Sequence, residues 1–486
     1  METQAKWQWA ALAALIVLQL FVMLYFANEK RAYHVDELYS YGLSNSYYMP
    51  FISRDFKHDT WLDKGYFEEY FTVQPGERFA YGSVYYNQTQ DVHPPLYYFF
   101  LHTACSLVPD TFSKWPGILL NMLFFIASNI VLFLLASRLL NSRWLSLIPC
   151  AIWGFSAGAI SSVVFIRMYV LLTLVVLCMT LLHCVMLFEK RHKPLLMFQI
   201  SLVTVLGFLT QYYFLIYTFF LAALYFVYLW IKRRWGGMLS YAGTMLSGLA
   251  AGVIVYPASL NHIFSSYRGK QSFSQLSGSA SYSEWVLAYY QIINNHLFFG
   301  KFKILLIILA VLLTLLLLSK FVIKVRFSYD KAQNKLTINT AFFKEAEVCV
   351  NIQRWFILCA MIAFAALGYI FTIAKIAPYR TDRYVFCVYP LILLCFFSAA
   401  YWLGGRMLKN KRVVAGAILA LFALFSIFSY KNGNAGYLYK NTNTNLESKM
   451  QAYAEYDSFF FCQPGTLRDV RLTLGAMQMM RHNRTY

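Results

Sequence analysis

Long apolar runs are the feature that most restricts how this chain can fold. Eleven stretches of roughly 17–25 residues carry almost no charge, and a helix needs about that length to cross the hydrocarbon core of a bilayer. They lie near residues 7–26, 115–137, 144–160, 169–188, 195–210, 213–231, 237–256, 303–320, 354–374, 385–404 and 413–429. Only 13% of the 486 residues are charged, whereas soluble domains carry about 25%. The sequence therefore predicts an all-α polytopic membrane protein with eleven transmembrane helices.

The charges between these runs predict the orientation in the membrane. Four short connections hold twelve Lys and Arg residues and one acid: Arg138 and Arg143; Lys190, Arg191 and Lys193 beside Glu189; Lys232, Arg233 and Arg234; and Arg406, Lys409, Lys411 and Arg412. Short basic loops stay in the cytoplasm. The amino terminus is then cytoplasmic, and residues 27–114, 257–302 and 430–486 lie outside. The net charge of +20 reflects this topology, so no nucleic-acid partner is expected.

The connecting segments have expected structures of their own. Residues 1–429 are expected to form one transmembrane domain, whose first span is retained instead of being cleaved as a signal peptide, and 430–486 a small extracytoplasmic tail. Polar and apolar residues alternate within 321–353, which predicts a cytoplasmic β-hairpin around a turn at Asp330–Asn334. Leu96–Val108 is apolar but too short for a span, so we expect a juxtamembrane helix on the outer face.

The adjacent carboxylates Asp36 and Glu37 are the first candidates for chemistry. They follow the first span directly, and charged groups at the rim of a span are costly unless they have partners or a function. A carboxylate there can act as a general base, with a pKa that burial raises and nearby cations lower. The alternative is that Asp36 only N-caps a helix that begins at Glu37. That alternative explains Asp36 but not the pair.

A second polar pair, Asp91 and His93, lies further along the same outer segment. The prolines that follow His93 predict the start of a helix, and we expect the pair to shape a substrate site beside Asp36. A metal site made of these two residues with Asp36 and Glu37 is an alternative, but no ligand spacing supports it. The nine cysteines show no CxxC pattern either. No metal or other cofactor is therefore expected.

Several outer cations break the positive-inside pattern. Arg167 is the only charge in one outer turn, and Lys375, Arg380 and Arg383 cluster in another. Arginine suits phosphate because its planar fork binds two oxygens at once. We therefore expect a phosphate site at this cluster, with Arg167 as a further member. The alternative is a structural ion pair of Asp382 with Arg380 or Arg383.

Four short motifs then carry a resemblance to a known class of enzymes. They are His34-Val-Asp36-Glu37, Asp91-Val-His93-Pro-Pro-Leu96, Phe165-Ile-Arg167-Met-Tyr169 and Arg383-Tyr384. Together they resemble the GT-C class of polyprenyl-phosphate-sugar glycosyltransferases. The sequence is similar in particular to family 39 and its bacterial relatives, the protein O-mannosyltransferases and the aminoarabinose transferases that act on lipid A. The shared layout extends to about residue 429.

The resemblance implies both a fold and roles for the matching residues. It implies a GT-C-like helical bundle in which Asp36 is the general base and Arg383 lies near the lipid phosphate, with Tyr169 and Tyr384 in the substrate site. Glu37 would orient the acceptor or tune Asp36. The large soluble domain that some relatives append is not expected here, so the acceptor cannot be inferred from them.

The resulting hypothesis is an inverting glycosyltransferase of the cell membrane with an extracytoplasmic active site. It would transfer a sugar from a polyprenyl phosphate to a glycan, lipid or protein acceptor, with membrane lipid as a further partner. The alternative function is a flippase or transporter of lipid-linked sugars without chemistry. A transporter needs ionisable residues inside the spans to mark a path, and His183 is the clearest candidate there.

Overall fold

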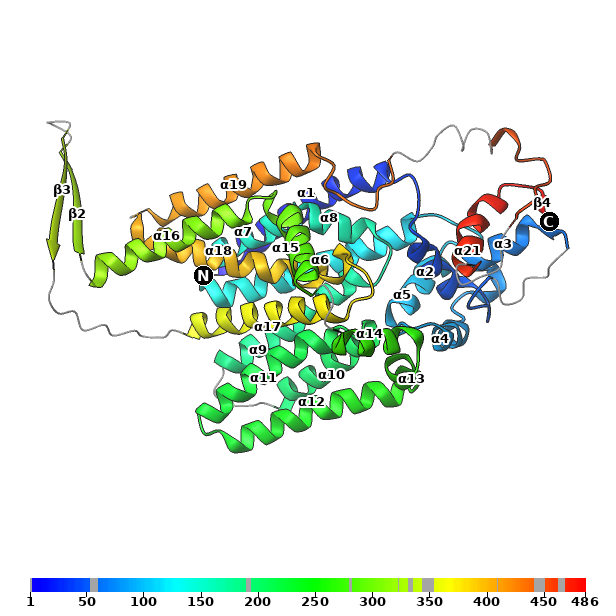
Figure 1. The fold of residues 1–486 in the computed structure, drawn as a ribbon, viewed down its shortest axis with the longest axis horizontal. Coiled ribbons are helices and arrows are strands. Elements are labelled where there is room, and N and C mark those ends of the chain that lie inside the picture. The colour runs from blue at the N-terminus through cyan, green and yellow to red at the C-terminus, as the bar shows by residue number, and fades with distance from the viewer. Residues whose placement is uncertain are drawn as a thin grey trace.

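An elongated bundle of helices forms most of the molecule, with smaller elements at both ends (Figure 1). The computed structural model describes residues 2–52, 60–188, 194–278, 282–321, 323–330, 335–342, 354–408, 410–440, 451–461 and 468–486. Of the basic residues that set the predicted orientation, Lys190, Arg191, Lys193 and Lys409 lie outside these ranges, as does most of the predicted hairpin turn, 331–334.

All eleven predicted runs fall on helices. The helices are α1 (Glu2–Glu29), α6 (Trp115–Leu140), α7 (Arg143–Gly154), α8 (Ala157–Val164), α9 (Tyr169–Phe188), α10 (Pro194–Thr210), α11 (Phe214–Ile231), α12 (Trp235–Val255), α16 (Phe302–Phe321), α17 (Arg354–Ile376), α18 (Tyr389–Met407) and α19 (Lys411–Lys431). Within the described ranges, eight helices are long and apolar enough to cross a membrane, or up to ten if each bent pair is one span. The chain is a multi-pass membrane protein, as predicted.

One predicted span, 144–160, is broken in the middle. Its two halves, α7 and α8, meet at an angle of 63°. Ser156 starts the second half, because its hydroxyl accepts a hydrogen bond from the amide of Ala159 at 3.1 Å. Gly154 ends the first half against Gln19, where a Cβ atom would come within 2.2 Å of the amide nitrogen of that side chain. The sequence pattern did not predict this bend, since both halves are apolar.

The predicted first outer connection, between α1 and α6, is mostly helical and lies at one end of the bundle (Figure 1). It contains α2 (Val35–Asn45), β1 (Leu62–Asp63), α3 (Lys64–Phe71), the 3-10 turn η1 (Pro75–Glu77), α4 (Tyr81–Gln90) and α5 (Leu96–Ser106). The helix α5 begins directly after the two prolines, which confirms the short apolar helix predicted for this stretch. The second outer connection also folds into helices, α13 (Ala258–Phe264), α14 (Tyr267–Ser277) and α15 (Tyr282–Phe298), and α15 meets α16 at 82°.

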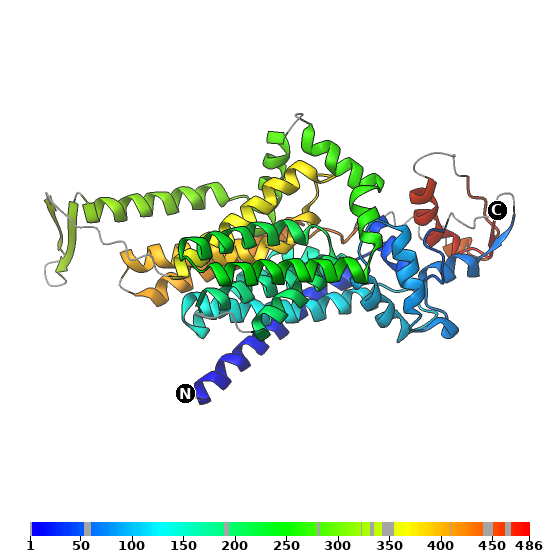
Figure 2. The same ribbon diagram turned by 90° about the horizontal axis from the view of Figure 1, so that it is seen from below.

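The carboxy-terminal tail packs on this first outer segment. Its helix α21 (Arg468–Met479) contacts α2 and α3, and its strand β4 (Arg484–Thr485) pairs antiparallel with β1. Figure 2 shows the tail beside the first outer connection in a second view. The hairpin of β2 (Ile323–Asp330) and β3 (Lys335–Phe342) is antiparallel, as predicted, and lies at the opposite end of the molecule (Figure 1).

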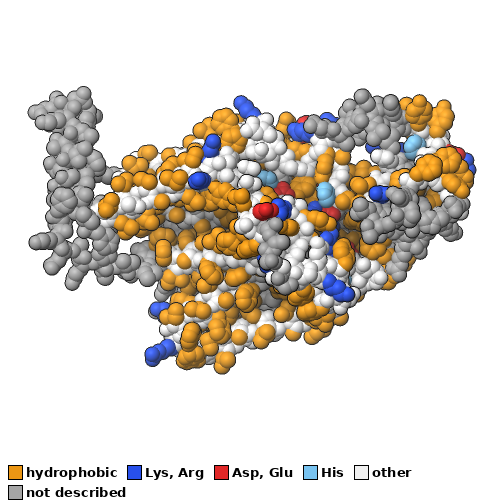
Figure 3. Space-filling model, in the orientation of Figure 1, with side chains coloured by type: hydrophobic (Ala, Val, Ile, Leu, Met, Phe, Trp, Pro, Cys, Tyr) orange, Lys and Arg blue, Asp and Glu red, His pale blue; other side chains and the backbone are white. Residues whose placement is uncertain are grey.

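The centre of the bundle is built around α9, in which 72% of the residues of the apolar stretch are buried. Hydrophobic side chains cover most of the visible face of the bundle (Figure 3). His183 lies inside it with both ring nitrogens engaged, Nδ1 by the carbonyl of Met179 at 2.8 Å and Nε2 by the hydroxyl of Tyr241 at 2.7 Å. The residue that would have marked a transport path therefore ties α9 to α12.

Candidate active site

The site begins with the way α2 starts. His34 is the N-cap residue: its Nδ1 accepts a hydrogen bond from the amide of Asp36 at 3.1 Å, and the carboxylate of Glu37 accepts one from the amide of His34 at 2.7 Å. This reciprocal capping box satisfies two of the amides that a helix leaves free at its start. The alternative that Asp36 is the N-cap is wrong, because the helix begins two residues earlier than expected. Asp36 is thus free to face the site.

Glu37 is fully buried and holds three segments together. Its carboxylate pairs with the ammonium of Lys30 at 3.0 Å and accepts a hydrogen bond from the amide of Ile166 at 2.8 Å. Burial raises the pKa of Glu37, against the opposing effects of Lys30 and the two amides. Burial also lowers the pKa of Lys30, which Glu37 opposes. Glu37 therefore anchors the start of α2 to the turn that carries Arg167.

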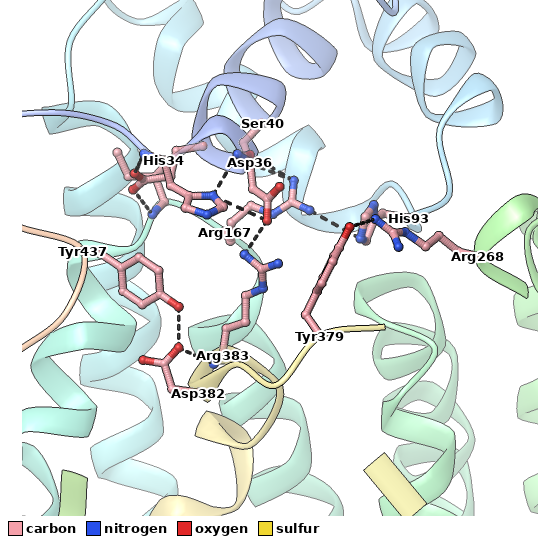
Figure 4. A network of polar contacts seen from close by, with 12 residues as sticks. His34, Asp36, Ser40, His93, Arg167, Arg268, Tyr379, Asp382, Arg383 and Tyr437 are labelled. Carbon is pink, nitrogen blue, oxygen red and sulfur yellow. Dashed lines mark hydrogen bonds and ion pairs between the residues drawn. The ribbon is translucent and has the colours of Figure 1, made fainter. Parts of the chain in front are cut away.

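Asp36 projects from the first turn of α2 towards a guanidinium group. Its Oδ2 lies 2.5 Å from a terminal nitrogen of Arg383, and its side chain is 24% exposed (Figure 4). Burial raises its pKa, but nearby positive groups, led by Arg167 and Arg383, together outweigh burial, so the pKa of Asp36 is lower than usual. His34 and His93 act in the same direction as these arginines. The free site therefore holds Asp36 as a carboxylate.

Arg167 is buried and braces the other side of Asp36. One terminal nitrogen donates to the backbone carbonyl of Asp36 at 3.1 Å, to the hydroxyl of Tyr98 at 3.0 Å and to that of Ser40 at 3.3 Å. The other terminal nitrogen lies 3.3 Å from Nε2 of His93. With these partners from α2, α5 and the outer loop, Arg167 fixes the position of Asp36.

The pair Asp91 and His93 extends this arrangement. The carboxylate of Asp91 lies 2.8 Å from Nδ1 of His93. A proton on Nδ1 would be held by that carboxylate, which leaves Nε2 as the acceptor for Arg167. Burial raises the pKa of Asp91, but His93, Arg167 and the amide of Val92 together outweigh burial, so this pKa is lower than usual. The two residues therefore lie beside Asp36, as predicted, and they contact it through Arg167.

Arg383 approaches Asp36 from the opposite side, out of the turn η2 (Asp382–Tyr384). Its guanidinium is nearly buried, lies over the rings of Phe165 at 5.9 Å and Tyr384 at 5.4 Å, and leaves Nε without a partner. Asp382 accepts a hydrogen bond from the amide of Arg383 at 2.8 Å. The Nε of Arg383 is therefore a buried donor to which the protein supplies no acceptor.

The ion pair of Asp382 with Arg380 or Arg383, which was the alternative to a phosphate site, does not form. The carboxylate of Asp382 instead accepts a hydrogen bond from the hydroxyl of Tyr437 and lies 3.7 Å from Nε2 of His296. Both partners come from distant parts of the chain, Tyr437 from the tail and His296 from α15. The sequence pattern therefore did not reveal the partners of Asp382.

The other two predicted phosphate ligands are engaged elsewhere. Arg380 is 42% exposed, pairs with Glu284 at 3.2 Å and lies over the ring of Trp285. Lys375 donates to the carbonyl of Gly278. Neither interaction links Arg380 or Lys375 to Asp36, so the structure brings Arg383 and Arg167 together but not the whole predicted cluster.

Aromatic rings line the site between the two arginines. Tyr169 stacks on Phe165 at 5.9 Å and meets Tyr384 edge-on at 6.4 Å. Phe165 also stacks on Tyr437 at 4.0 Å. The two predicted tyrosines, Tyr169 and Tyr384, thus belong to the wall that surrounds Arg383.

Sequence reasoning missed three residues at the site. Arg268 of α14 donates to the hydroxyl of Tyr379 at 3.0 Å, and both lie on the His93 side of the network (Figure 4). Tyr437 lies on the opposite side (Figure 4). Arg268 lies in a predicted outer connection that has little charge. Arg167 was selected as a cation on the outer side that breaks the positive-inside pattern, and the same criterion would have selected Arg268. Tyr437 has no comparable signal.

The candidate metal ligands have separate partners. Asp36 pairs with Arg383, Glu37 with Lys30, and Asp91 with His93. Among the described residues, no group of three or more His, Cys, Asp or Glu side chains could hold a metal ion.

Comparison with known proteins identifies the fold. No protein-family model and no curated protein matches the sequence. The structure is similar to ArnT from Cupriavidus metallidurans bound to undecaprenyl phosphate, with a TM-score of 0.53 and 12% identity over 98% of this chain and 85% of that chain. The apo state of that ArnT matches with a TM-score of 0.47 and 12% identity, over 97% of this chain and 85% of that chain. The first of these similarities confirms the GT-C-like fold.

Proposed function

We propose that this protein transfers a sugar from a polyprenyl phosphate to an acceptor, on the extracytoplasmic side of the membrane. The observation that carries the proposal is the ion pair of Asp36 with Arg383, which is braced by Arg167. It brings the proposed base and the proposed phosphate ligand into one site. The fold supports the same function, because the similar ArnT structure contains undecaprenyl phosphate.

Arg383 is the proposed ligand of the donor phosphate. Its guanidinium already contacts one anion, the carboxylate of Asp36, and its Nε has no partner. Two parallel hydrogen bonds from a guanidinium match the oxygens of a phosphate. Arg268 lies on the other side of the site and would supply a second positive charge (Figure 4). A phosphate leaving group needs this electrostatic stabilisation instead of a general acid.

Asp36 is the proposed general base. Its carboxylate would take the proton of an acceptor hydroxyl or amine while the acceptor oxygen or nitrogen forms a bond to the anomeric carbon. The bond between that carbon and the phosphate oxygen breaks, and the electron pair leaves with polyprenyl phosphate. One base is enough for this single displacement, which inverts the anomeric carbon, whereas glycosidases use two carboxylates. No step of this scheme requires a metal ion.

Glu37 is proposed to position Asp36. Its carboxylate is fully buried and shared among Lys30, His34 and Ile166, so contact with an acceptor would break these interactions. In this role Glu37 holds α2 against the Arg167 turn, and Asp36 then faces Arg383.

An apolar cavity of about 490 Å³ offers a place for part of the donor's lipid tail. It is lined by Phe220 of α11, Leu276 of α14, Tyr282 of α15, and Phe371 and Lys375 of α17. Isoprenoid chains are apolar, so burial in such a groove is favourable. Lys375 would then line the cavity that takes the lipid tail instead of binding the phosphate.

Reconstituted liposomes test this function and separate it from a flippase. Protein is supplied with a synthetic polyprenyl-phosphate sugar and a mixture of candidate acceptors, and both covalent transfer and movement of the lipid between leaflets are measured. We expect sugar on an acceptor with wild-type protein and little with the folded Asp36→Asn variant. Redistribution of the lipid without transfer would support the flippase, and transfer by Asp36→Asn at the wild-type rate would refute the role of Asp36.

A further inference from the structure

We propose that Tyr437 is a positioning residue that holds Arg383 in place against Asp36. It lies in the segment 434–440, between α19 and the folded part of the tail. The inference deepens the proposed function, on which it rests, because it concerns the geometry of the proposed base and phosphate ligand. Three parts of Tyr437 make contacts at the site. Its hydroxyl and its ring contact the residues around Arg383, and its carbonyl contacts Lys30 near the start of α2.

The hydroxyl acts on the turn that carries Arg383. It donates a hydrogen bond to Oδ1 of Asp382, and the same oxygen accepts the amide of Arg383 at 2.8 Å. The remaining oxygen of Asp382 lies 3.7 Å from His296. Without the hydroxyl, the carboxylate of Asp382 would be free to turn away from the amide of Arg383.

The ring supports the surface over which the guanidinium lies. Tyr437 stacks on Phe165 with ring centroids 4.0 Å apart, and the guanidinium of Arg383 lies 5.9 Å from the centre of the Phe165 ring. His34 contacts both rings edge-on, at 5.7 Å to Phe165 and 6.2 Å to Tyr437. The stacked rings of Phe165 and Tyr437 therefore form one side of the pocket that holds the guanidinium of Arg383.

The carbonyl reaches the side of Asp36. It accepts a hydrogen bond from the ammonium of Lys30 at 2.7 Å, and Lys30 pairs with Glu37 in the first turn of α2. Tyr437 therefore contacts Asp382, which holds the amide of Arg383, and Lys30, which pairs with Glu37, the residue next to Asp36. Among the described residues of the tail, it is the one that engages Asp382, Phe165 and Lys30 together.

The backbone of this segment is held in a costly conformation. Tyr437 has φ +63° and Tyr439 has φ +51°, and the left-handed region is sterically unfavourable for residues that carry a Cβ atom. Two hydrogen bonds of 2.8 Å hold the flanking residues, from the amide of Gly436 to the hydroxyl of Ser161 and from the amide of Arg31 to the carbonyl of Leu438. These anchors keep Tyr437 directed into the site.

The test uses Tyr437→Phe, which removes only the hydroxyl. The matched control is Tyr430→Phe, because the hydroxyl of Tyr430 donates to the carbonyl of Phe155 and is outside the network around Asp36. Full-length proteins in nanodiscs are labelled with a carbodiimide, which reacts with protonated carboxyls, and labelling of Asp36 is followed by mass spectrometry across pH. This readout reports the contact of Asp36 with Arg383 and does not depend on turnover.

We expect the labelling midpoint of Asp36 to rise by about one pH unit in Tyr437→Phe and to stay unchanged in Tyr430→Phe. The other groups that face Asp36, namely Arg167, His34 and His93, are the same in both proteins. Asp382→Asn should shift the midpoint in the same direction, and the double variant no further than the larger single shift, because both changes release the same arginine. An unchanged midpoint in Tyr437→Phe, or an equal shift in Tyr430→Phe, would overturn the proposal.

Failure of the proposed function has a different signature. If wild-type protein neither binds undecaprenyl phosphate nor transfers sugar, the glycosyltransferase proposal fails, while the labelling result still decides whether Tyr437 positions Arg383. If wild-type protein is active, the donor KM of Tyr437→Phe should rise several-fold more than that of Tyr430→Phe. Equal donor KM values in the two variants would count against Tyr437.

Discussion

Replacement of Asp36 by asparagine should separate catalysis from donor binding. In the free site, the carboxylate of Asp36 lies 2.5 Å from Arg383, which is also the proposed phosphate ligand. The donor phosphate must therefore compete with Asp36 for the same guanidinium. The asparagine side chain has no negative charge, so it would not hold Arg383 in an ion pair. It would also not repel the negatively charged phosphate. We expect Asp36→Asn to bind undecaprenyl phosphate more tightly than the wild type.

The size of this gain follows from the burial of the pair. Two unit charges 4 Å apart interact by about 1 kcal/mol in water and about 4 kcal/mol at an effective dielectric constant of 20. The side chain of Asp36 is 24% exposed, so an intermediate value of about 1–3 kcal/mol applies, or roughly 5- to 160-fold in affinity. Loss of the general base should at the same time lower kcat by roughly 10²- to 10⁴-fold.

The assay compares binding and turnover of the same purified variants. Undecaprenyl phosphate binding is measured in nanodiscs, and transfer is measured with a synthetic donor. A matched control is Asp457→Asn, because Asp457 pairs with Arg484 at 2.6 Å on the exposed tail and should change neither quantity. Weaker lipid binding by Asp36→Asn would refute the competition between Asp36 and the phosphate, and a kcat near the wild-type value would refute the assignment of the base.

Three further variants test the remaining contacts of the site. Arg383→Gln should weaken donor affinity. Because Arg383 keeps the pKa of Asp36 low, the variant should also move the acid limb of the kcat/KM profile upwards by about 1–3 pH units. An acid limb at the wild-type pH would contradict the effect of Arg383 on the pKa of Asp36. Glu37→Gln should destabilise the fold by about 3–5 kcal/mol, because it leaves Lys30 buried and unpaired. Thermal unfolding in detergent measures this loss, which Lys30→Met in the same chain should partly restore. Arg380→Gln should change stability by less than about 1 kcal/mol and leave the donor KM unchanged, since its ion pair is exposed; a donor KM as high as that of Arg383→Gln would instead place Arg380 at the phosphate.

The apolar runs determined the helices and the fold class without tertiary information. Backbone polar groups find no water in the hydrocarbon core, so a long apolar run can cross it only as a helix. The short run after His93 was separated from the spans by its length, and it forms α5 directly after its two prolines. The alternation of polar and apolar residues likewise predicted the pairing of β2 with β3. Each of these features depends on neighbours along the chain.

Candidate site residues could be selected from the sequence because charges at the rim of a span are costly. That criterion selected Asp36, Arg167 and Arg383, and the structure brings all three into contact. It also selected Arg380, which has a different partner, Glu284. The cost of a charge shows that it needs a partner, but not which partner it has.

The tertiary structure alone decided those partners. Asp36 meets Arg383, and Glu37 binds Ile166, across more than a hundred intervening residues. The contacts of Tyr437 depend on the fold of the whole chain, since a half-buried tyrosine in a tail has no periodic pattern that would mark it. The sequence by itself thus determined the helices and the charges at their rim, because these follow from local length and polarity. The pairing of those charges was left to the packing of distant segments, which sets the distances on which an ion pair or a hydrogen bond depends.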